Sequence, residues 1–428
     1  MQVDAIPLTY TQKFIFMVVS QLGPAAAKLQ LATCVRISGP IDVERFERAS
    51  AALMVRHPIL CSRLDYRNGD LVQLLGGEAP PLALFNVEGD FDWQADIMLS
   101  KLADQPFDLF VDNPFKVILT RVTSTEAYLM LVGHHLFIDD TALQILLADY
   151  LDILLADSAD TEEADSNDGN FHSWAKQQVE RRRNGGFARN VGHWLSYLDG
   201  ADPVLHFPDR RAEPTVQSMV ALPFVLDRRQ ATRFMDRADH LGVTNFALAA
   251  TAIFHALREA TGQDEILLSA ISNTRRPPYE RTIGDFAGMI LIRQSGRNSG
   301  MADESVRLVS RDTMSALRNH IPQSYLADQV SWLKGRLERG FSMTDAYINY
   351  LPMATDVGQA KKNGYEITSF NLKNRTEPSN VPYHGVLLSF LIRPTRESLA
   401  GIIEYESAVV TSRIAQQIRA SFLNALSS

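Results

Sequence analysis

Two adjacent histidines stand next to a pair of aspartates in residues 133–140, which read Gly-His-His-Leu-Phe-Ile-Asp-Asp. A neutral imidazole is the side chain whose ordinary pKa lies nearest neutral pH, so a histidine here could remove a proton from an attacking amine or alcohol. Neighbouring side chains of a strand point to opposite faces, so only one of the two histidines can face a given cavity if the segment is extended. We therefore expect one histidine to act and the other to support it.

The spacing of these residues alone leaves other roles open. Asp139 could orient the loop or cap the helix that follows, because a carboxylate at a helix N-terminus accepts backbone N–H bonds. The two histidines could also be half of a metal site or two hydrogen-bonded core residues. The only thiols, Cys34 and Cys61, lack CxxC spacing. They indicate neither a zinc site nor a disulfide framework, so we expect both to be buried.

The apolar pattern predicts the elements that must position this segment. In the first half it predicts strands at 31–37, 115–122 and 128–133 and helices at 43–57 and 141–155, followed by a solvated acidic loop at 157–170. In the second half it predicts strands at 221–226, 265–271, 346–350, 387–392 and 400–405, and helices at 227–241, 245–261 and 412–426. Strands and helices alternate in both halves, which indicates the α/β class.

The length of the chain indicates how many domains it has, and its charge argues against one class of function. A chain of 428 residues exceeds the roughly 250 to 300 residues that one core serves, so we expect two domains with a cleft between them. The polar stretch 209–214 places the boundary near residue 210, giving domains 1–210 and 211–428. The net charge of −8 argues against general nucleic-acid binding, which needs a basic face. No apolar run has the length of a membrane helix and no secretory signal is evident, so a cytoplasmic location is expected.

The segment 133–140 resembles the HHxxxDG core motif of nonribosomal peptide synthetase condensation domains and of their acyltransferase relatives. Further segments resemble the other blocks of this family in order along nearly the whole chain: 8–12, 39–42 with 56–60, 106–109 with 114–115, 193–208, 275–293, 349–350 and 399–405. The sequence is therefore identified as a member of the condensation-domain superfamily.

The resemblance implies an α/β fold of two chloramphenicol-acetyltransferase-like lobes in a V, with the motif in a central tunnel. It makes His135 the catalytic base and His134 its structural neighbour. It also implies a structural salt bridge between the motif carboxylate, Asp139, and Arg275, with Arg276 as an alternative partner. Asn349, beside Tyr347 on a strand, could position substrate by donating to the developing oxyanion, or it could serve the structure alone.

Two residues depart from the family pattern. Asp140 stands where the motif has glycine, so its side chain could reshape the acceptor channel and position substrate, or it could cap the following helix. Gly288 stands where the "fvN" block has asparagine.

The function that the resemblance implies is an acyltransferase of natural-product biosynthesis. It would condense an acyl thioester on an acyl or peptidyl carrier protein with a small-molecule or carrier-bound amine or hydroxyl, forming an amide or an ester. Phosphopantetheine would arrive on the donor carrier, so no cofactor, metal, nucleic acid or membrane is expected. The chain would be a free-standing enzyme, because no adenylation or carrier segment is recognisable, or one excised domain.

Two alternative functions, and the role of one arginine-rich surface, remain to be considered. The chain could be an acyl-CoA-dependent alcohol acyltransferase, or a catalytically silent recruitment module, although the intact His135 speaks against the latter. The run Arg181–Arg183 ends a helix, where the helix dipole favours positive charge. Together with Arg189 and Arg210–Arg211 it could also form a local basic surface for an acidic carrier protein.

Overall fold

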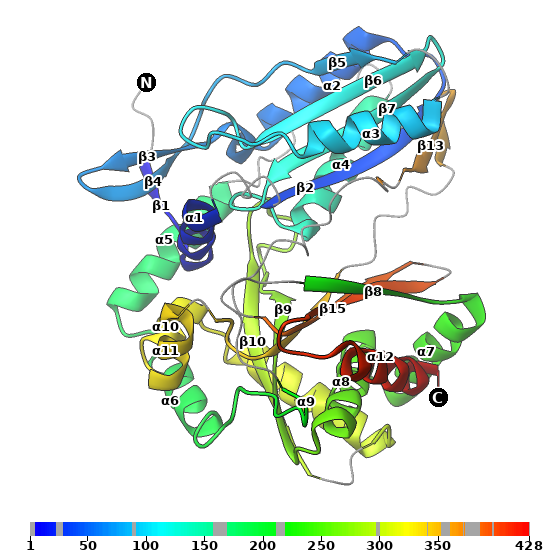
Figure 1. Ribbon diagram of the computed structural model, residues 1–428. Helices are drawn as coiled ribbons and strands as arrows, with labels where there is room; N and C mark the ends of the chain where they lie inside the picture. Colours follow the sequence, from blue (N-terminus) through cyan, green and yellow to red (C-terminus); the bar gives the residue numbers. More distant parts are fainter. Residues whose placement is uncertain are drawn as a thin grey trace. The chain divides into compact units, whose positions relative to one another are not determined.

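The computed structural model describes residues 5–22, 29–87, 91–156, 169–210, 219–296, 300–339, 341–351, 360–370, 372, 386–395 and 398–427. The chain divides into two compact units, whose elements are labelled in Figure 1. The first unit comprises Met1–Gly185, Arg275–Phe286 and Thr355–Val381. The second unit comprises Gly186–Thr274, Ala287–Ala354 and Pro382–Ser428. Each unit is thus assembled from separate stretches of the chain.

A six-stranded sheet of order β12-β13-β2-β7-β6-β5 is the centre of the first unit. Its strands are β2 (Gln30–Ser38), β5 (Ala83–Asn86), β6 (Phe115–Thr123), β7 (Glu126–His134), β12 (Ala360–Lys362) and β13 (Tyr365–Ser369). Side chains of β7 alternate between two cores, with Leu129 and Leu131 in one and Tyr128 and Met130 in the other. Both faces of β7 are therefore buried, which fixes the position of the histidines at its end.

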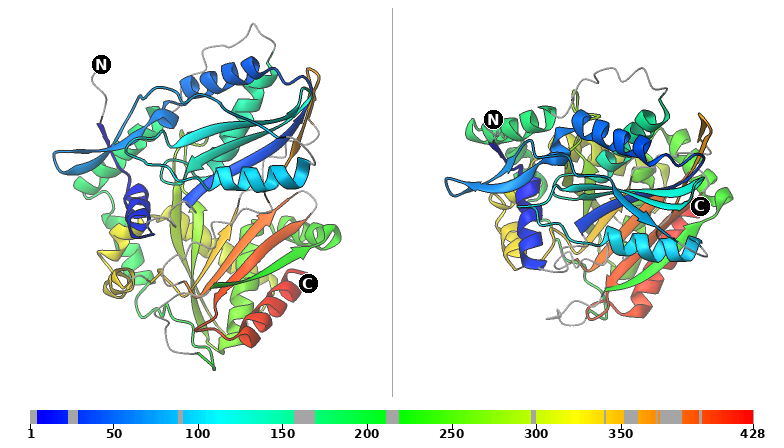
Figure 2. Two further views of the ribbon diagram at one scale, coloured as in Figure 1. Left: turned by 45° about the horizontal axis from the view of Figure 1, so that its top comes forward. Right: turned by 90° about the horizontal axis from the view of Figure 1, so that it is seen from above.

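Helices cover both faces of this sheet. Helices α2 (Val43–Arg56) and α4 (Asp140–Leu155) pack on one face and α3 (Phe91–Ala103) on the other (Figures 1 and 2). Helix α2 buries Phe46, Ala49 and Leu53 at helical spacing, and it ends where Pro58 begins a short 3-10 helix, Pro58–Cys61. The unit also contains α1 (Tyr10–Leu22), α5 (Gly169–Arg183) and a small sheet of β1 (Ala5–Pro7), β3 (Arg63–Arg67) and β4 (Asp70–Leu74).

The second unit is built on a sheet of order β10-β9-β11-β14-β15-β8. Its strands are β8 (Met219–Leu226), β9 (Glu265–Asn273), β10 (Ala287–Ser295), β11 (Ala346–Tyr350), β14 (Leu388–Pro394) and β15 (Leu399–Glu406). Its helices are α6 (Ala188–Tyr197), α7 (Arg228–Leu241), α8 (Asn245–Thr261), α9 (Asp303–Arg318), α10 (Gln323–Ala327), α11 (Ser331–Glu338) and α12 (Ser412–Ser427). Helices α7, α8, α9 and α12 share one apolar core with this sheet.

The α/β class and every strand and helix predicted above are confirmed within the described residues, with ends that differ by a few positions. The predicted acidic loop at 157–170 lies almost wholly outside the described residues; α5 begins at Gly169. Cys34 and Cys61 are both buried, as expected. In the described ranges no single helix is long and apolar enough to cross a membrane. Within the same ranges, α7 and α8 taken together reach that length and composition, and they are bent by 106°.

The domain boundary differs from the one expected at residue 210. The chain passes from the first unit to the second at Gly185–Gly186, because Trp194, Leu205 and Phe207 are buried in the core of the second unit. The polar stretch that indicated a boundary follows this docked segment instead of preceding it. Residues 275–286 and 355–381 return to the first unit, which no single boundary could describe.

Candidate active site

A tight turn between β7 and α4 carries the two histidines. The N–H of His134 donates to the carbonyl of Pro114 at 2.8 Å, and the N–H of His135 donates to the carbonyl of Leu29 at 2.9 Å. The carbonyl of His134 then accepts from the N–H of Phe137 at 2.9 Å. These bonds fix the backbone of both histidines, so their side chains project in defined directions.

His134 belongs to the interior of the first unit. Its residue is 3% exposed, and its ring meets Phe107 edge to face, with centroids 6.3 Å apart. The Nδ1 atom accepts from the N–H of Leu136 at 3.1 Å, so the proton of the neutral ring lies on Nε2. Burial, and then the nearby His135, lower the pKa of His134 to about 3. His134 is therefore neutral at ordinary pH, and its contacts serve the structure of the first unit.

His135 has the opposite hydrogen-bonding pattern. Its residue is only partly buried, and its Nδ1 lies 3.2 Å from the carbonyl oxygen of Ile138. A carbonyl oxygen only accepts, so Nδ1 carries the proton in the neutral ring and Nε2 keeps a lone pair. A fixed tautomer with a basic Nε2 is what a general base requires.

Asp139 uses both carboxylate oxygens within the fold. Its Oδ1 accepts from the N–H of Ala142 at 2.7 Å, which makes it the N-cap of α4, and its Oδ2 accepts from the N–H of Phe286 at 2.9 Å. Arg275 donates from Nη1 to Oδ2 at 2.5 Å and from Nη2 to Oδ1 at 2.8 Å. The salt bridge implied between these two residues is thus present, and its side chains are 7% and 2% exposed for Asp139 and Arg275.

Arg275 is held in place by its own segment. Its Nη2 donates to the carbonyls of Thr282 at 3.2 Å and Gly284 at 3.0 Å, and its guanidinium lies 4.4 Å from the ring centroid of Phe286. A Cβ at Gly284 would come within 2.1 Å of the Phe171 ring, which explains the glycine. Of the two arginines considered, Arg275 rather than Arg276 makes the pair with Asp139.

Carboxylates set the charge around His135. Burial alone would lower the pKa of His135, but the negative charges of Asp285, Asp140 and Asp139 outweigh burial and raise it above the ordinary value of 6.5. Asp140 is the first residue of α4, and the cap is Asp139, so the alternative of Asp140 as the cap is wrong. Asp285 was not among the predicted site residues; the available signal was one acidic residue between the apolar Ile283 and Phe286.

The remaining predicted residues belong to the second unit. Asn349 lies on β11, opposite Leu391 of β14, and is partly exposed. Gly288 lies on β10, where a Cβ would come within 2.5 Å of Thr274 Cγ2 and 2.6 Å of His320 Nε2. The His320 ring therefore occupies the space that an asparagine at position 288 would need.

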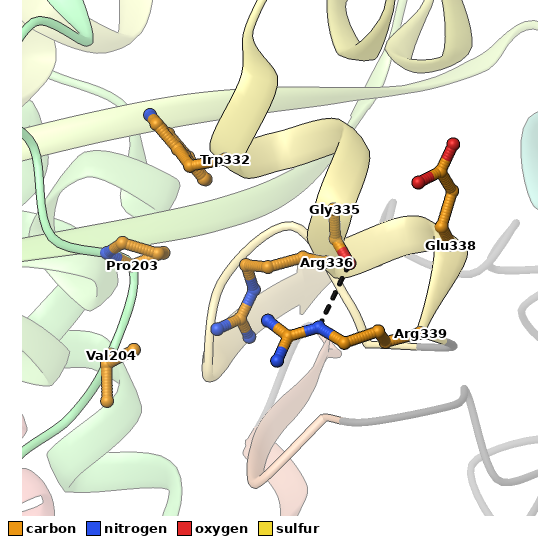
Figure 3. A pocket seen from close by; sticks show the side chains of 7 residues that line it. All are labelled: Pro203, Val204, Trp332, Gly335, Arg336, Glu338 and Arg339. Carbon is orange, nitrogen blue, oxygen red and sulfur yellow. Dashed lines mark hydrogen bonds between the residues drawn. The ribbon is translucent and has the colours of Figure 1, made fainter.

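A pocket of about 490 Å³ also lies in the second unit, lined by Pro203, Val204, Trp332, Gly335, Arg336, Glu338 and Arg339 (Figure 3). It contains none of the predicted site residues. Arg336 and Arg210 each donate to the buried carboxylate of Asp345 at 2.8 Å, so this arginine cluster braces the fold. Among the described residues, no group of three or more His, Cys, Asp or Glu side chains could hold a metal ion.

Comparisons with known proteins find related sequences and related folds. The family model described as "Condensation domain" matches residues 2–427. Bacitracin synthase 2 of Bacillus licheniformis is 25% identical over 327 residues, which are 76% of this chain and 12% of that protein. This chain thus spans about a tenth of the length of such relatives.

Two solved structures share the fold. The X-domain from teicoplanin biosynthesis matches with a TM-score of 0.78 and 17% identity, over 100% of this chain and 95% of that one. The starter condensation domain of rhizomide synthetase RzmA, a variant in complex with C8-CoA, matches with a TM-score of 0.77 and 17% identity, over 99% of this chain and 95% of that one.

Proposed function

The chain belongs to the condensation-domain family, and we propose that it is an acyltransferase that joins a carrier-bound acyl thioester to an amine or hydroxyl acceptor. The observation that carries this proposal is the tautomer of His135. Its Nδ1–H is bonded to the carbonyl of Ile138, so Nε2 keeps the lone pair that accepts the acceptor's proton.

The reaction balances with this one side chain as the proton carrier. As the acceptor nitrogen or oxygen attacks the thioester carbon, its proton passes to Nε2 of His135. The new C–N or C–O bond forms, the C–S bond of the tetrahedral intermediate breaks, and the departing thiolate takes the proton from the imidazolium. No acyl group is attached to the protein at any stage. The thiol belongs to phosphopantetheine on the carrier protein, so this chain supplies positioning and proton transfer.

The neighbours of His135 support this role through structure. His134 is buried and neutral, and the pair of Asp139 with Arg275 joins the start of α4 to residues 275–286. These contacts hold the turn on which His135 lies. Asn349 and Asp140 are proposed to position substrate. Asp139 is proposed to contribute indirectly, by holding the turn that carries His135 in place.

Two other functions have a specific observation in their favour. The rhizomide starter domain binds C8-CoA, which favours an acyl-CoA donor in place of a carrier. The teicoplanin X-domain has been seen in complex with OxyB, which favours a recruitment module without catalysis. The basic Nε2 of His135 supports the catalytic proposal over recruitment.

Intact-protein mass spectrometry of acylated carrier proteins tests the proposal. Incubation with the protein and an amine or alcohol acceptor is expected to remove the acyl mass from the carrier and yield the amide or ester. His135→Ala is expected to slow this loss by roughly 10²- to 10⁴-fold, the usual contribution of a general base. His240→Ala, an exposed histidine at the end of α7, is the matched control. Equal rates for His135→Ala and the unsubstituted protein would exclude the mechanism.

A further inference from the structure

The pocket of the second unit is lined on one side by a single face of helix α11 and its C-cap. The four residues that form this face are spaced as neighbours on successive turns of a helix: Trp332, Gly335, Arg336 and Arg339. Pro203 and Val204, from the segment after α6, line the pocket as well (Figure 3). Its volume is about 490 Å³. Cavities that bind small molecules measure roughly 300 to 1,000 Å³, so this pocket has the size of a ligand site.

Gly335 leaves part of the pocket wall open. Beyond its own stretch of helix, a Cβ at Gly335 would meet no atom of the described residues within 4 Å. Glycine inside a helix costs stability relative to alanine, because it loses more backbone freedom on folding. The side chain that is missing at this position therefore leaves space in the pocket at a cost to the helix.

The two arginines of the pocket differ in what they already bind. Arg336 is 6% exposed, and it donates from Nε to the carbonyl of Ser342 and from Nη2 to Asp345, both at 2.8 Å. Arg339 is exposed, and its Nε donates to the carbonyl of Gly335 at 3.1 Å. Within the described ranges, the Nη1 and Nη2 atoms of Arg339 have no hydrogen-bond or ion-pair partner. Arg339 is thus the guanidinium that is available to a ligand.

The direction of the Arg339 side chain is defined by its surroundings. Besides the bond of its Nε to the helix, its guanidinium carbon lies 5.3 Å from the ring centroid of Phe341, and that of Arg336 lies 5.6 Å from the same centroid. Figure 3 shows both guanidinium groups directed to the same part of the pocket, with the carboxylate of Glu338 directed away from them. Glu338 is 65% exposed and lies 3.9 Å from Lys334. The part of the pocket that the arginines face is therefore suited to an anion.

We propose that this pocket binds a small aromatic carboxylate, with the carboxylate on Arg339 and the ring against Trp332. The two Nη atoms of a guanidinium form a planar fork that matches the two oxygens of a carboxylate. One available guanidinium balances one negative charge, which favours a carboxylate over a phosphate dianion. Trp332, Pro203 and Val204 supply the apolar surface on which a flat ring packs. The inference does not depend on the reaction proposed for His135, because that residue does not line the pocket.

Isothermal titration calorimetry of the whole protein with trans-cinnamate tests this inference, and trans-cinnamamide is the uncharged control probe. Cinnamate is expected to bind at one site, roughly tenfold or more tightly than the amide, because a charged hydrogen-bond pair with Arg339 is lost in the amide. Arg339→Gln is expected to reduce the affinity for cinnamate to that for the amide. Arg48→Gln is the matched control, because Arg48 has a 67% exposed side chain in the first unit, and it should leave the affinity unchanged.

A second variant tests the open wall of the pocket. Gly335→Leu places a side chain in the space that the ring would occupy, so it is expected to abolish cinnamate binding while circular dichroism shows a folded protein. Gly192→Leu is its control, because Gly192 lies in α6 with open space at its own Cα. Arg339→Gln changes an exposed side chain, so the test does not depend on whether Gly335→Leu folds.

The affinities decide the inference. Failure of cinnamate to bind the unsubstituted protein overturns it, and so does equal affinity for cinnamate and the amide. Cinnamate binding that is unchanged in folded Arg339→Gln lies at another site and overturns it too. Loss of affinity in Arg339→Gln but not in Arg48→Gln supports it. Because the measurement is binding, a protein that binds cinnamate in this way but transfers no acyl group would count against the proposed function alone.

Discussion

Arg275 and Asp139, 136 positions apart in the sequence, meet through two parallel N–H···O bonds of 2.5 and 2.8 Å. The same carboxylate caps α4 and accepts from the backbone of Phe286, so one side chain fixes three parts of the first unit. This two-point geometry is specific to arginine, because lysine cannot donate from a planar fork.

Removing one partner of this pair is expected to destabilise the first unit strongly. Arg275→Ala leaves the carboxylate of Asp139 buried without its cation, which costs roughly 3 to 5 kcal/mol. Chemical denaturation measures the loss. Arg48→Ala is the control, because Arg48 has a 67% exposed side chain and makes only long contacts of 3.7 and 3.9 Å. Its cost is expected to stay within about 0.5 kcal/mol. Equal losses for both variants would contradict the buried pair.

The buried His134 predicts a particular dependence of stability on pH. Its pKa is about 3 in the folded protein and 6.5 when exposed, so between these values the unfolded chain binds the extra proton. The free energy of unfolding therefore falls as pH decreases below 6.5, by up to about 1.4 kcal/mol per pH unit from this group. His134→Asn keeps an acceptor for the N–H of Leu136 and cannot titrate, so its curve is expected to be shallower from pH 6.5 to 4. Parallel curves for the two proteins would refute this assignment.

His320 and Gly288 are expected to behave as a coupled pair. Gly288→Asn forces a side chain against Thr274 and His320, and such overpacking costs typically about 1 to 3 kcal/mol. His320→Ala in the same protein vacates that space, so the double variant is expected to recover part of the loss. Gly192→Ala, in α6 with open space at its Cα, is the control and should be neutral or stabilising. Strictly additive losses would show that His320 does not fill the site.

The kind of acyl donor, carrier protein or CoA, can be identified from the effect of salt concentration on the reaction rate. A carrier protein held by charge should lose rate as salt rises, whereas a small pantetheine thioester should change little. Arg182 donates to the Tyr10 hydroxyl at 3.1 Å and Arg210 is paired with Asp345, while Arg183 is exposed at the end of α5. Arg183→Ala is therefore expected to slow only the carrier-dependent reaction, with Arg48→Ala as control. Equal rates and salt effects for acyl-CoA and acyl carrier would favour the CoA-dependent alternative.

Much of the site could be predicted because its residues lie within one short motif. The end of β7, the start of α4 and the helix-capping carboxylate follow from local pattern, and the partner of Asp139 followed from a second family block. The place of Asp285 beside the motif could not be predicted, because it depends on how residues 275–286 return to the first unit. His57 likewise offered no partner in the sequence, yet its Nε2 lies 2.8 Å from Asp149 on α4.

The individual helices and strands could be predicted, but the assignment of chain segments to the two units could not. Amphipathic periodicity reports which face of an element is buried, and it carries no information about which core receives that face. The segment with Trp194 has an amphipathic pattern that would fit the core of either unit. Only its packing shows that it belongs to the second. The short strand β13 pairs with β2 across more than 300 positions of sequence, a contact that no local pattern encodes.

The return of residues 275–286 and 355–381 to the first unit has a consequence for synthesis on the ribosome. Asp139 is made 136 residues before Arg275, a delay on the order of ten seconds at about 5 to 20 residues per second. During that interval the nascent first unit has a capped α4 but no arginine for its buried carboxylate, and β2 lacks its neighbour β13. The first unit therefore cannot complete its fold until most of the second unit has been translated, so the two units must mature together.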